Sequence, residues 1–421
     1  MRKRAWIKLA IALLLCSCLI GLAAASEAGD EILDIYGNAN EDDIIDWADV
    51  NYIKQVIFGK KPYTSLADAN YDGKISMLDV AQTKLIILGK EKRLTVVDEA
   101  GRTVTISKPV KKIAAGGADN AEFIRLLKAK DRIVAVDKST ENSEVFFPEL
   151  SQLPLVNDHH EVNYEKMYEL HPDIFITYAP ASLTEPDFIE IVDRLEPVGI
   201  KVICLGFYKP TPLIKNVKKL GYILDKEEEA EEFIGFYEGI MNYIEERVEG
   251  VPEKDKPRVF YEYYRDYLTC AEGMGVHEYI VKAGGINIAA ELPGLYPTVD
   301  AEWVIKQNPD IILRITYHPY TASGYGEDDP SEMEALRNAI INRPELAEID
   351  AVKNEKVYVF SYEIGESPRH FVCIAYFAKW FHPELFGDIE PQAIHQEYLT
   401  RFQELDYDLN EHGVFVYPVS G

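Results

Sequence analysis

The sequence predicts an α/β protein whose main body consists of two lobes joined by one long helix. Three observations support this prediction. Strand and helix patterns alternate through most of the chain, which is typical of parallel sheets. A unit containing Glu, Pro-Asp-Ile and an apolar strand occurs twice, beginning at Glu165 and at Glu302. The clearest helix pattern of the chain, residues 225–250, lies between the two copies.

The chain begins with the pattern of an export signal. Basic residues precede an apolar run that ends in Ala23-Ala24-Ala25 before Ser26. We therefore expect residues 1–25 to be a cleaved signal peptide. The alternative is a lipid-modified Cys18, because the residues before it are of permitted types. In both cases we expect an exported protein on the outer side of the cytoplasmic membrane, either secreted or membrane-associated.

Composition narrows the possible functions. The chain has 421 residues, 47% of them hydrophobic, and a formal charge of −27. The length allows roughly two to three domains with buried cores. The strong negative charge argues against nucleic acid and against anionic lipid surfaces as partners. Beyond the signal, Cys204, Cys270 and Cys373 are scattered in apolar stretches, so we expect buried free thiols rather than a disulfide framework.

A repeated acidic loop occupies residues 33–90. The pattern that begins at Asn38 recurs from Asp68, and each copy continues into a short apolar helix. Oxygen-bearing residues stand at positions 1, 3, 5, 9 and 12 of both loops, an arrangement suited to Ca²⁺. Position 6 is Gly73 in the second loop but Asp43 in the first, where we expect weaker affinity. The predicted ligands of two calcium ions are Asn38, Asn40, Asp42, Asp46, Asp49, Asp68, Asn70, Asp72, Lys74, Ser76 and Asp79.

Residues 33–90 resemble the dockerin family. Aspartate at position 12, short flanking helices and the duplication carry the resemblance. It implies a small all-α, EF-hand-type module that binds calcium and docks on a cohesin-like partner. In that family positions 10 and 11 of each loop face the partner, and here they are the unusually apolar Trp47-Ala48 and Met77-Leu78. Two alternatives are an acidic hairpin without metal and a module that packs against its own chain.

The body starts with a predicted β-hairpin, residues 94–106, that turns at Gly101. A strand at residues 112–115, a helix at residues 120–129 and a strand at residues 133–136 follow, which is the order of a βαβ unit. The long helix at residues 225–250 begins with Asp225 as its expected N-cap, and three glutamates load its first turn. An apolar stripe at three- and four-residue steps runs along it, over about 35 Å.

This body resembles the solute-binding proteins of ABC importers for iron–siderophores, haem and cobalamin. The matching segments, in order, are the hairpin with Gly101-Arg102, Asp131 to Val136, the two Glu…Pro-Asp-Ile units, Ala283 to Ala289, Val352 to Val359, and Trp380 to Glu384. The resemblance covers about residues 94–390. It implies two Rossmann-like lobes, residues 94–208 and 253–390, a connecting helical segment at 209–252, and a ligand between the lobes. Residues 391–421 form a C-terminal extension.

Tyrosines are the main candidates for ligand contact. Ligands of parallel sheets bind beyond the carboxyl ends of the strands, and the loops expected there are rich in tyrosine. Tyrosine combines a rigid apolar plate with a polar tip, which suits a large, flat or chelated ligand. The alternative is that the chain simply has many tyrosines, 26 in all. The predicted contacts are Tyr178, Tyr208, Tyr264, Tyr296, Tyr317 and Tyr362.

The resemblance implies four further functional residues. His159 occupies a ligand-contact position of the family, and its alternative is a solvated surface histidine. Arg369 lies in another contact region, and its alternative is a pair with Glu363 or Glu366. Glu165 and Glu302 match surface glutamates that dock on the membrane permease, and their alternative is an ordinary acid in a first helical turn.

The sequence favours a binding protein over an enzyme. It contains no Walker loop, G-x-S-x-G, HExxH or CxxC motif. We expect a protein that captures a metal chelate, such as an iron–siderophore, haem or a cobamide, and delivers it to an ABC-importer permease. The alternatives are a dockerin-bearing secreted hydrolase and a scaffold protein. Beyond calcium, no cofactor is expected.

Overall fold

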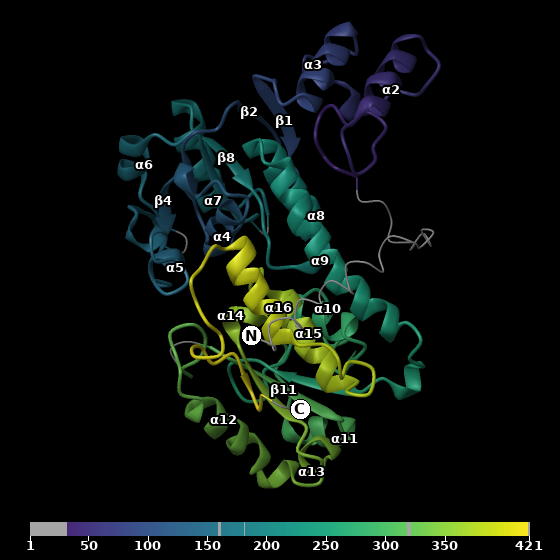
Figure 1. Ribbon diagram of the computed structural model, residues 1–421, viewed down its shortest axis with the longest axis vertical. Coiled ribbons are helices and arrows are strands. Elements are labelled where there is room, and N and C mark those ends of the chain that lie inside the picture. Colours follow the sequence, from purple (N-terminus) through teal and green to yellow (C-terminus); the bar gives the residue numbers. More distant parts are fainter. Residues whose placement is uncertain (1–31, 159–160, 181, 318–320, 420–421) are drawn as a thin grey trace, which may run out of the picture. The chain divides into compact units, whose positions relative to one another are not determined.

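A computed structural model describes residues 32–158, 161–180, 182–317 and 321–419 (Figure 1). The expected signal peptide and Cys18 lie outside the described residues, as does His159. None of the helices in these ranges is long and apolar enough to cross a membrane. The three described cysteines, Cys204, Cys270 and Cys373, are buried and free, which confirms the prediction made for them.

The first sheet has six strands in the order β6-β5-β4-β3-β7-β8, and all neighbours are parallel except β5 and β6. Its strands are β3 (Ile113–Ala115), β4 (Ile133–Asp137), β5 (Leu155–Asp158), β6 (Glu161–Val162), β7 (Ile174–Thr177) and β8 (Lys201–Cys204). The connecting helices are α4 (Ala118–Leu126), α5 (Lys138–Glu141), α6 (Tyr164–Leu170) and α7 (Pro186–Leu195). The predicted hairpin, β1 (Arg93–Val97) and β2 (Thr103–Ser107), precedes them. The predicted βαβ order is therefore confirmed.

The second sheet has five strands in the order β10-β9-β11-β12-β13, and only β13 is antiparallel to its neighbour. Its strands are β9 (Arg258–Glu262), β10 (Ile286–Asn287), β11 (Ile311–Thr316), β12 (Val357–Ser361) and β13 (Val416–Tyr417). Its helices are α10 (Gly275–Lys282), α11 (Ala301–Gln307), α12 (Ser331–Ile341), α13 (Asp350–Lys353), α14 (Tyr362–Gly365) and α15 (His370–Phe381). The central strands are buried on both faces, as parallel strands covered by helices require.

The repeated sequence unit has the same local structure in both copies. In each copy a seven-residue helix, α6 or α11, precedes a central strand, β7 or β11. The Asp173 carboxylate accepts the main-chain N–H of Lys112 at 2.9 Å. The Asp310 carboxylate likewise accepts the N–H of Arg258 at 2.8 Å. Each aspartate thus fixes the start of the neighbouring strand, which explains why Pro-Asp-Ile occurs twice.

Two helices, α8 (Pro210–Leu224) and α9 (Glu227–Val248), connect the two sheets in sequence. The prediction that Asp225 is the N-cap of the long helix is wrong. Asp225 has a left-handed φ of 54° and ends α8. Its carboxylate lies 2.7 Å from Lys108 Nζ and caps nothing in α9. The carboxylate that the sequence pattern predicted to cap α9 therefore forms an ion pair with Lys108 instead.

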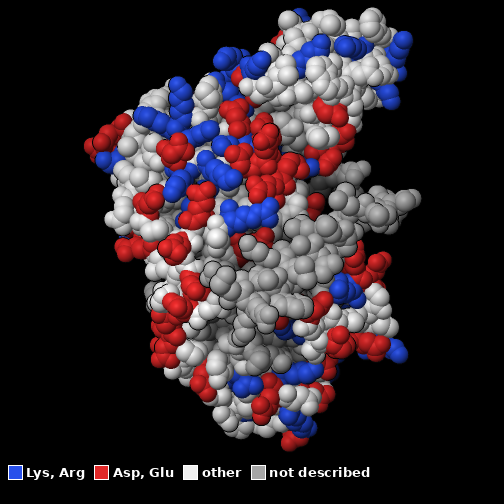
Figure 2. Space-filling view, viewed as in Figure 1, with Lys and Arg blue, Asp and Glu red and all other residues white. Residues whose placement is uncertain are grey.

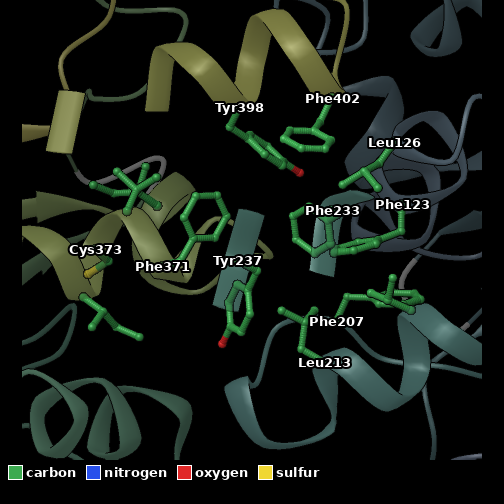
Figure 3. Close-up of a cluster of buried hydrophobic side chains, with 14 of the residues drawn as sticks. Phe123, Leu126, Phe207, Leu213, Phe233, Tyr237, Phe371, Cys373, Tyr398 and Phe402 are labelled. Carbon is green, nitrogen blue, oxygen red and sulfur yellow. The ribbon is translucent and has the colours of Figure 1, made fainter. Parts of the chain in front are cut away.

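Helix α9 packs against side chains from three distant parts of the chain (Figure 3). The Phe233 ring centroid lies 5.3 Å from that of Phe123 on α4, 6.5 Å from Phe371 on α15 and 5.6 Å from Phe402. All four rings are buried. Acidic and basic side chains are interspersed on the face drawn in Figure 2. Glu232 of α9 pairs with Arg401 at 2.9 Å.

The C-terminal extension links the two sheets. It consists of α16 (Pro391–Glu397), a π-helical turn η8 (Tyr398–Phe402) and the edge strand β13. The Tyr398 hydroxyl donates to Glu122 Oε1 of α4 at 2.5 Å, and Arg125 Nε donates to Gln403 Oε1 at 2.6 Å. Since β13 pairs with β12 of the second sheet, the extension is bonded to both sheets.

The N-terminal module contains α2 (Trp47–Ile57) and α3 (Met77–Ile87) and packs against its own chain. Ile35 and Ile45 belong to the same buried cluster as Leu94 and Val96 of β1. Lys218 Nζ of α8 donates to Asp43 Oδ2 at 2.6 Å. Of the alternatives for this module, packing on the same chain is therefore confirmed.

Replacing Tyr398 by Phe removes a hydroxyl that donates to Glu122 and accepts from Gln403 Nε2 at 2.8 Å. Both partners stay buried without that bond, so we expect the free energy of unfolding to fall by about 2 kcal/mol. Urea unfolding followed by fluorescence measures it. Tyr63→Phe, at a side chain 68% exposed, is the matched control and should leave stability unchanged. An unchanged Tyr398→Phe midpoint would show that the extension does not bind the sheets together.

Candidate ligand-binding site

Tyrosines gather at the carboxyl ends of the second sheet. Tyr263 and Tyr264 follow β9, Tyr317 follows β11 and Tyr362 follows β12. The ring of Tyr263 lies 4.8 Å from Tyr264 and 5.2 Å from Tyr296, centroid to centroid. Tyr317 lies 5.6 Å from Tyr264 and 5.2 Å from Tyr362. The structure therefore brings four predicted residues together in one aromatic cluster, with Tyr263 in addition.

Two predicted tyrosines lie at the carboxyl ends of the first sheet. The rings of Tyr178, after β7, and Tyr208, after β8, are 6.4 Å apart. The Tyr178 ring packs on the main chain at Gly117, where an added Cβ would lie only 2.7 Å from it. Any other residue at position 117 would displace the ring, which accounts for the Gly-Gly turn. Tyr178, Tyr296 and Tyr362 are each about two-fifths exposed, so their rings are accessible to a ligand.

Sequence reasoning missed two carboxyl groups among these tyrosines. Asp119 of α4 lies near the Tyr178 hydroxyl, and each group shifts the pKa of the other. The Tyr263 hydroxyl donates to Glu366 Oε2 at 3.0 Å. Burial raises the pKa of Asp119 to about 7, helped by nearby Glu122, and burial also raises the pKa of Glu366 to about 7. Asp119 stands in the first turn of α4 and Glu366 directly after α14, so the signal was an acidic residue near the tyrosine-rich ends of the strands.

Arg369 was predicted to contact the ligand, but the structure gives its side chain other partners. Its side chain is buried, with Nη1 donating to Glu122 Oε2 at 2.5 Å and Nε donating to the Glu363 carbonyl at 2.7 Å. The guanidinium also lies over the Phe146 ring, 4.3 Å from its centroid. Its main partner is Glu122, a residue that sequence reasoning did not consider. The structure thus favours the structural role for Arg369.

Glu165 and Glu302 are both exposed, and each stands in the first turn of its helix, α6 or α11. The two residues occupy equivalent positions because each begins one copy of the repeated sequence unit. An exposed acid at each of two repeated sites is available for a partner, although a first helical turn also favours acids. Their docking role stays a prediction.

The two N-terminal loops are closed in the same way by the acid at position 12. Asp49 accepts the main-chain N–H of Asn40 at 3.1 Å and that of Asp46 at 2.8 Å. Asp79 accepts those of Asn70 at 3.1 Å and Ser76 at 2.7 Å. Burial raises the pKa of Asp49 to about 6 and raises that of Asp79.

The loop residues fit a hard cation that takes amide and main-chain oxygens. Asn38 is fully buried at position 1, and its Oδ1 has no hydrogen-bond partner. Gly73 has a left-handed φ of 85° at the sharp turn of the second loop. Within the described ranges, no group of three or more His, Cys, Asp or Glu side chains is arranged to hold a metal. A calcium ion there would therefore need Asn38 and main-chain carbonyls among its ligands.

One surface pocket lies away from the tyrosines. It has a volume of about 550 Å³ and is formed by the C-terminal extension. Its lining residues are Gln396, Thr400, Glu404, Leu405, Asp406, Tyr407, Asp408 and Asn410. None of the predicted ligand contacts lines it.

Known proteins place this architecture in one class, that of bacterial binding proteins. The family model described as periplasmic binding protein matches residues 113–362. A Vitamin B12-binding protein of Vibrio campbellii is 21% identical over 257 residues, covering 58% of this chain and 87% of the relative. The crystal structure of a TroA-like periplasmic binding protein, FepB, from Veillonella parvula matches with a TM-score of 0.64 and 23% identity, over 76% of this chain and 98% of that one.

The periplasmic Vitamin B12 binding protein BtuF of Vibrio cholerae has a TM-score of 0.50 and 19% identity, over 67% of this chain and 99% of its own. These likenesses show the mixed α/β fold. The family match covers more than half of the chain, so this protein belongs to the periplasmic binding protein family. Its role is the binding of a small-molecule solute. The N-terminal module lies outside the matched residues.

Glu366 gives a pH-dependent prediction. Since burial raises its pKa from 4.5 to about 7, the folded state disfavours the ionised form, and stability falls as the pH rises through this window. Glu366→Gln should therefore be more stable than the wild type by about 1–3 kcal/mol at pH 8 and equal to it at pH 4. Urea unfolding at both pH values measures this. Glu246→Gln, at an exposed position of α9, should change nothing, and equal stability of Glu366→Gln at pH 8 would contradict the prediction.

Proposed function

We propose that this protein captures a metal chelate at its strand-end tyrosines and delivers it to the permease of an ABC importer. The observation that carries the proposal is the gathering of aromatic rings at the carboxyl ends of both sheets. Aromatic rings offer large rigid contact area to a flat ligand, and their hydroxyls fix its orientation. An exported location, outside the cytoplasmic membrane, goes with this role.

Among iron–siderophores, haem and cobamides, the relatives favour a cobamide-like ligand. Relatives from Vibrio campbellii and Vibrio cholerae are named Vitamin B12-binding proteins. A corrin ring is large and flat, and its amide side chains offer donors and acceptors to tyrosine hydroxyls.

A thermal-shift panel with haem, cyanocobalamin and ferric siderophores tests the proposal. The bound ligand should raise the melting temperature, because a ligand at a hundred times its Kd stabilises by about 2.7 kcal/mol. Tyr296→Ala should lose most of the shift. Tyr63→Ala, in the N-terminal module, should keep it. If no chelate moves the melting temperature while the protein cleaves a polysaccharide, the secreted-hydrolase alternative replaces the proposal.

For delivery, we propose that Glu165 and Glu302 dock on the permease. The double variant with Glu165→Arg and Glu302→Arg should abolish uptake by the importer while ligand affinity stays unchanged, because both side chains are exposed on α6 and α11. The control is Glu169→Arg, which replaces another exposed acid of α6 and should leave transport normal. Loss of ligand affinity in the double variant would instead place these residues in the ligand site.

We also propose that residues 33–90 form a dockerin-like module that binds two calcium ions and engages a cohesin-like partner. The unpartnered, buried Asn38 Oδ1 supports the calcium site. Three apolar side chains at the family's partner positions support the partner, since Trp47, Met77 and Leu78 are 57%, 60% and 63% exposed. Other residues of the module, Ile35, Ile45 and Asp43, make its contacts with the rest of the chain, so these three exposed side chains are available to another protein.

Calcium should protect the module locally. Removing it with EGTA should speed amide hydrogen exchange in residues 38–49 and 68–79 and leave the two sheets unaffected, because the ligands all belong to these loops. Asp79→Asn should abolish the response of the second loop only. Magnesium at equal concentration should not substitute, since it demands a tighter octahedral site. Identical exchange with and without calcium would refute the metal site.

A further inference from the structure

We propose that the tyrosine site selects ligands that are cationic or rich in hydrogen-bond donors, and that Asp119 and Glu366 are the residues that select them. This inference rests on the proposed function and adds the charge class of the ligand. It would separate this protein from binding proteins that take anionic ferric chelates.

The two carboxyl groups come from opposite sheets and lie on either side of the buried ion pair between Glu122 and Arg369, whose charged atoms are 2.5 Å apart. Asp119 lies in the first turn of α4, after β3, and Glu366 follows α14, after β12. The charges of both Glu366 and Asp119 raise the pKa of Tyr362, in addition to the effect of burial. The charge of Tyr362 in turn helps to raise the pKa of Tyr178. Asp119 precedes Glu122 by three residues, and Glu366 precedes Arg369 by three, so the ion pair brings together the two segments that carry the acids. A ligand on the exposed ring of Tyr362 would lie beside this junction.

Both acids lie beside tyrosine hydroxyls. Tyr263 donates to Glu366 Oε2 at 3.0 Å, and the Tyr178 hydroxyl lies near Asp119. One donor satisfies only part of a carboxylate, which can accept about four hydrogen bonds. The remaining lone pairs are those a ligand donor would fill. An amide N–H, a hydroxyl or an ammonium group fits this requirement, and a carboxylate or catecholate does not.

A second observation at the same place indicates missing polar partners. Asn120, next to Asp119, is fully buried, and neither its Oδ1 nor its Nδ2 has a hydrogen-bond partner. The hydroxyl of fully buried Tyr261 is also unpartnered, and the charge of Glu366 raises the pKa of this phenol beyond the effect of burial. Leaving buried polar atoms without partners is energetically costly, so a polar ligand or ordered water is expected beside them.

The cationic side chains near the two acids interact with other groups. Arg369, whose charge reaches Asp119, donates to Glu122 and to the Glu363 carbonyl. Lys209 and Arg265 lie over the rings of Tyr208 and Tyr264, at 5.5 Å and 5.1 Å from the centroids. In the described ranges neither Asp119 nor Glu366 forms an ion pair with Lys or Arg. An anionic ligand would thus meet two carboxylates that lack a direct ion pair, whereas a cation would offset their burial.

Matched chelates of different charge test the inference. Ferrioxamine B, whose chain ends in an ammonium group, is compared with its N-acetylated, uncharged form, and cyanocobalamin is compared with a derivative in which one side-chain amide is a carboxylate. Calorimetry at pH 8, where both carboxyls are ionised, gives the Kd values. In the pair whose scaffold the wild type binds, the more positive member should bind about tenfold more tightly.

Substitutions of Asp119 and Glu366 test whether these two residues cause the preference for the more positive ligand. Asp119→Asn and Glu366→Gln keep shape and acceptor oxygens, and each should reduce the preference severalfold, while the double variant should abolish it. Glu246→Gln, which makes the same change of net charge on α9, should leave it unchanged, and melting curves confirm folding. Tight binding with no charge preference, or a preference retained in the double variant, overturns this inference and leaves the proposed function standing. Failure of every chelate to bind overturns both.

Discussion

The ion pair between Glu122 and Arg369 is the contact on which the geometry of the site depends. It joins α4, beside the first sheet, to the segment after β12 of the second sheet, and both residues are buried. Asp119 precedes Glu122 by one helical turn, and Glu366 precedes Arg369 by the same number of residues. The ion pair thus sets the separation of the two site carboxyls. Breaking one partner of a buried pair costs about 3–5 kcal/mol, so this separation is strongly defined.

Other groups complete the environment of the pair. Tyr398 of the C-terminal extension occupies the second oxygen of Glu122, and Phe146 covers the Arg369 guanidinium. Arg125, which stacks on Phe146 at 4.5 Å, is tied to the extension through Gln403. Around this polar centre the rings of α4, α9 and α15 exclude water (Figure 3). The connecting helix α9 is therefore one wall of a core shared by both sheets rather than an isolated strut.

Local sequence patterns predicted the elements well. Alternation predicted the hairpin, the central strands and the βαβ order, and the repeated Pro-Asp-Ile unit predicted two similar halves because its aspartate has a fixed local task in both. The tyrosine cluster was also predicted, since the carboxyl ends of parallel strands share one edge.

The failures concern side chains whose partners are distant in sequence. Asp225 was assigned to a helix cap, but it pairs with Lys108, and Arg369 was assigned to the ligand, but it pairs with Glu122, 247 positions away. Asp119 and Glu366 were missed because the tyrosines that lie beside them, Tyr178 and Tyr263, are distant in sequence and only the fold brings them close. No local pattern records which residue of the opposite sheet a charge will meet.

The C-terminal extension has a consequence for biosynthesis. A nascent chain that has not yet reached Tyr398 already contains every strand of the first sheet and all but the edge strand of the second. It lacks the Tyr398 hydroxyl, which donates to Glu122, and it lacks β13, the strand that pairs with β12. The two halves are therefore locked together only after residues 391–421 have been synthesised, although nearly all strands of both sheets emerge earlier.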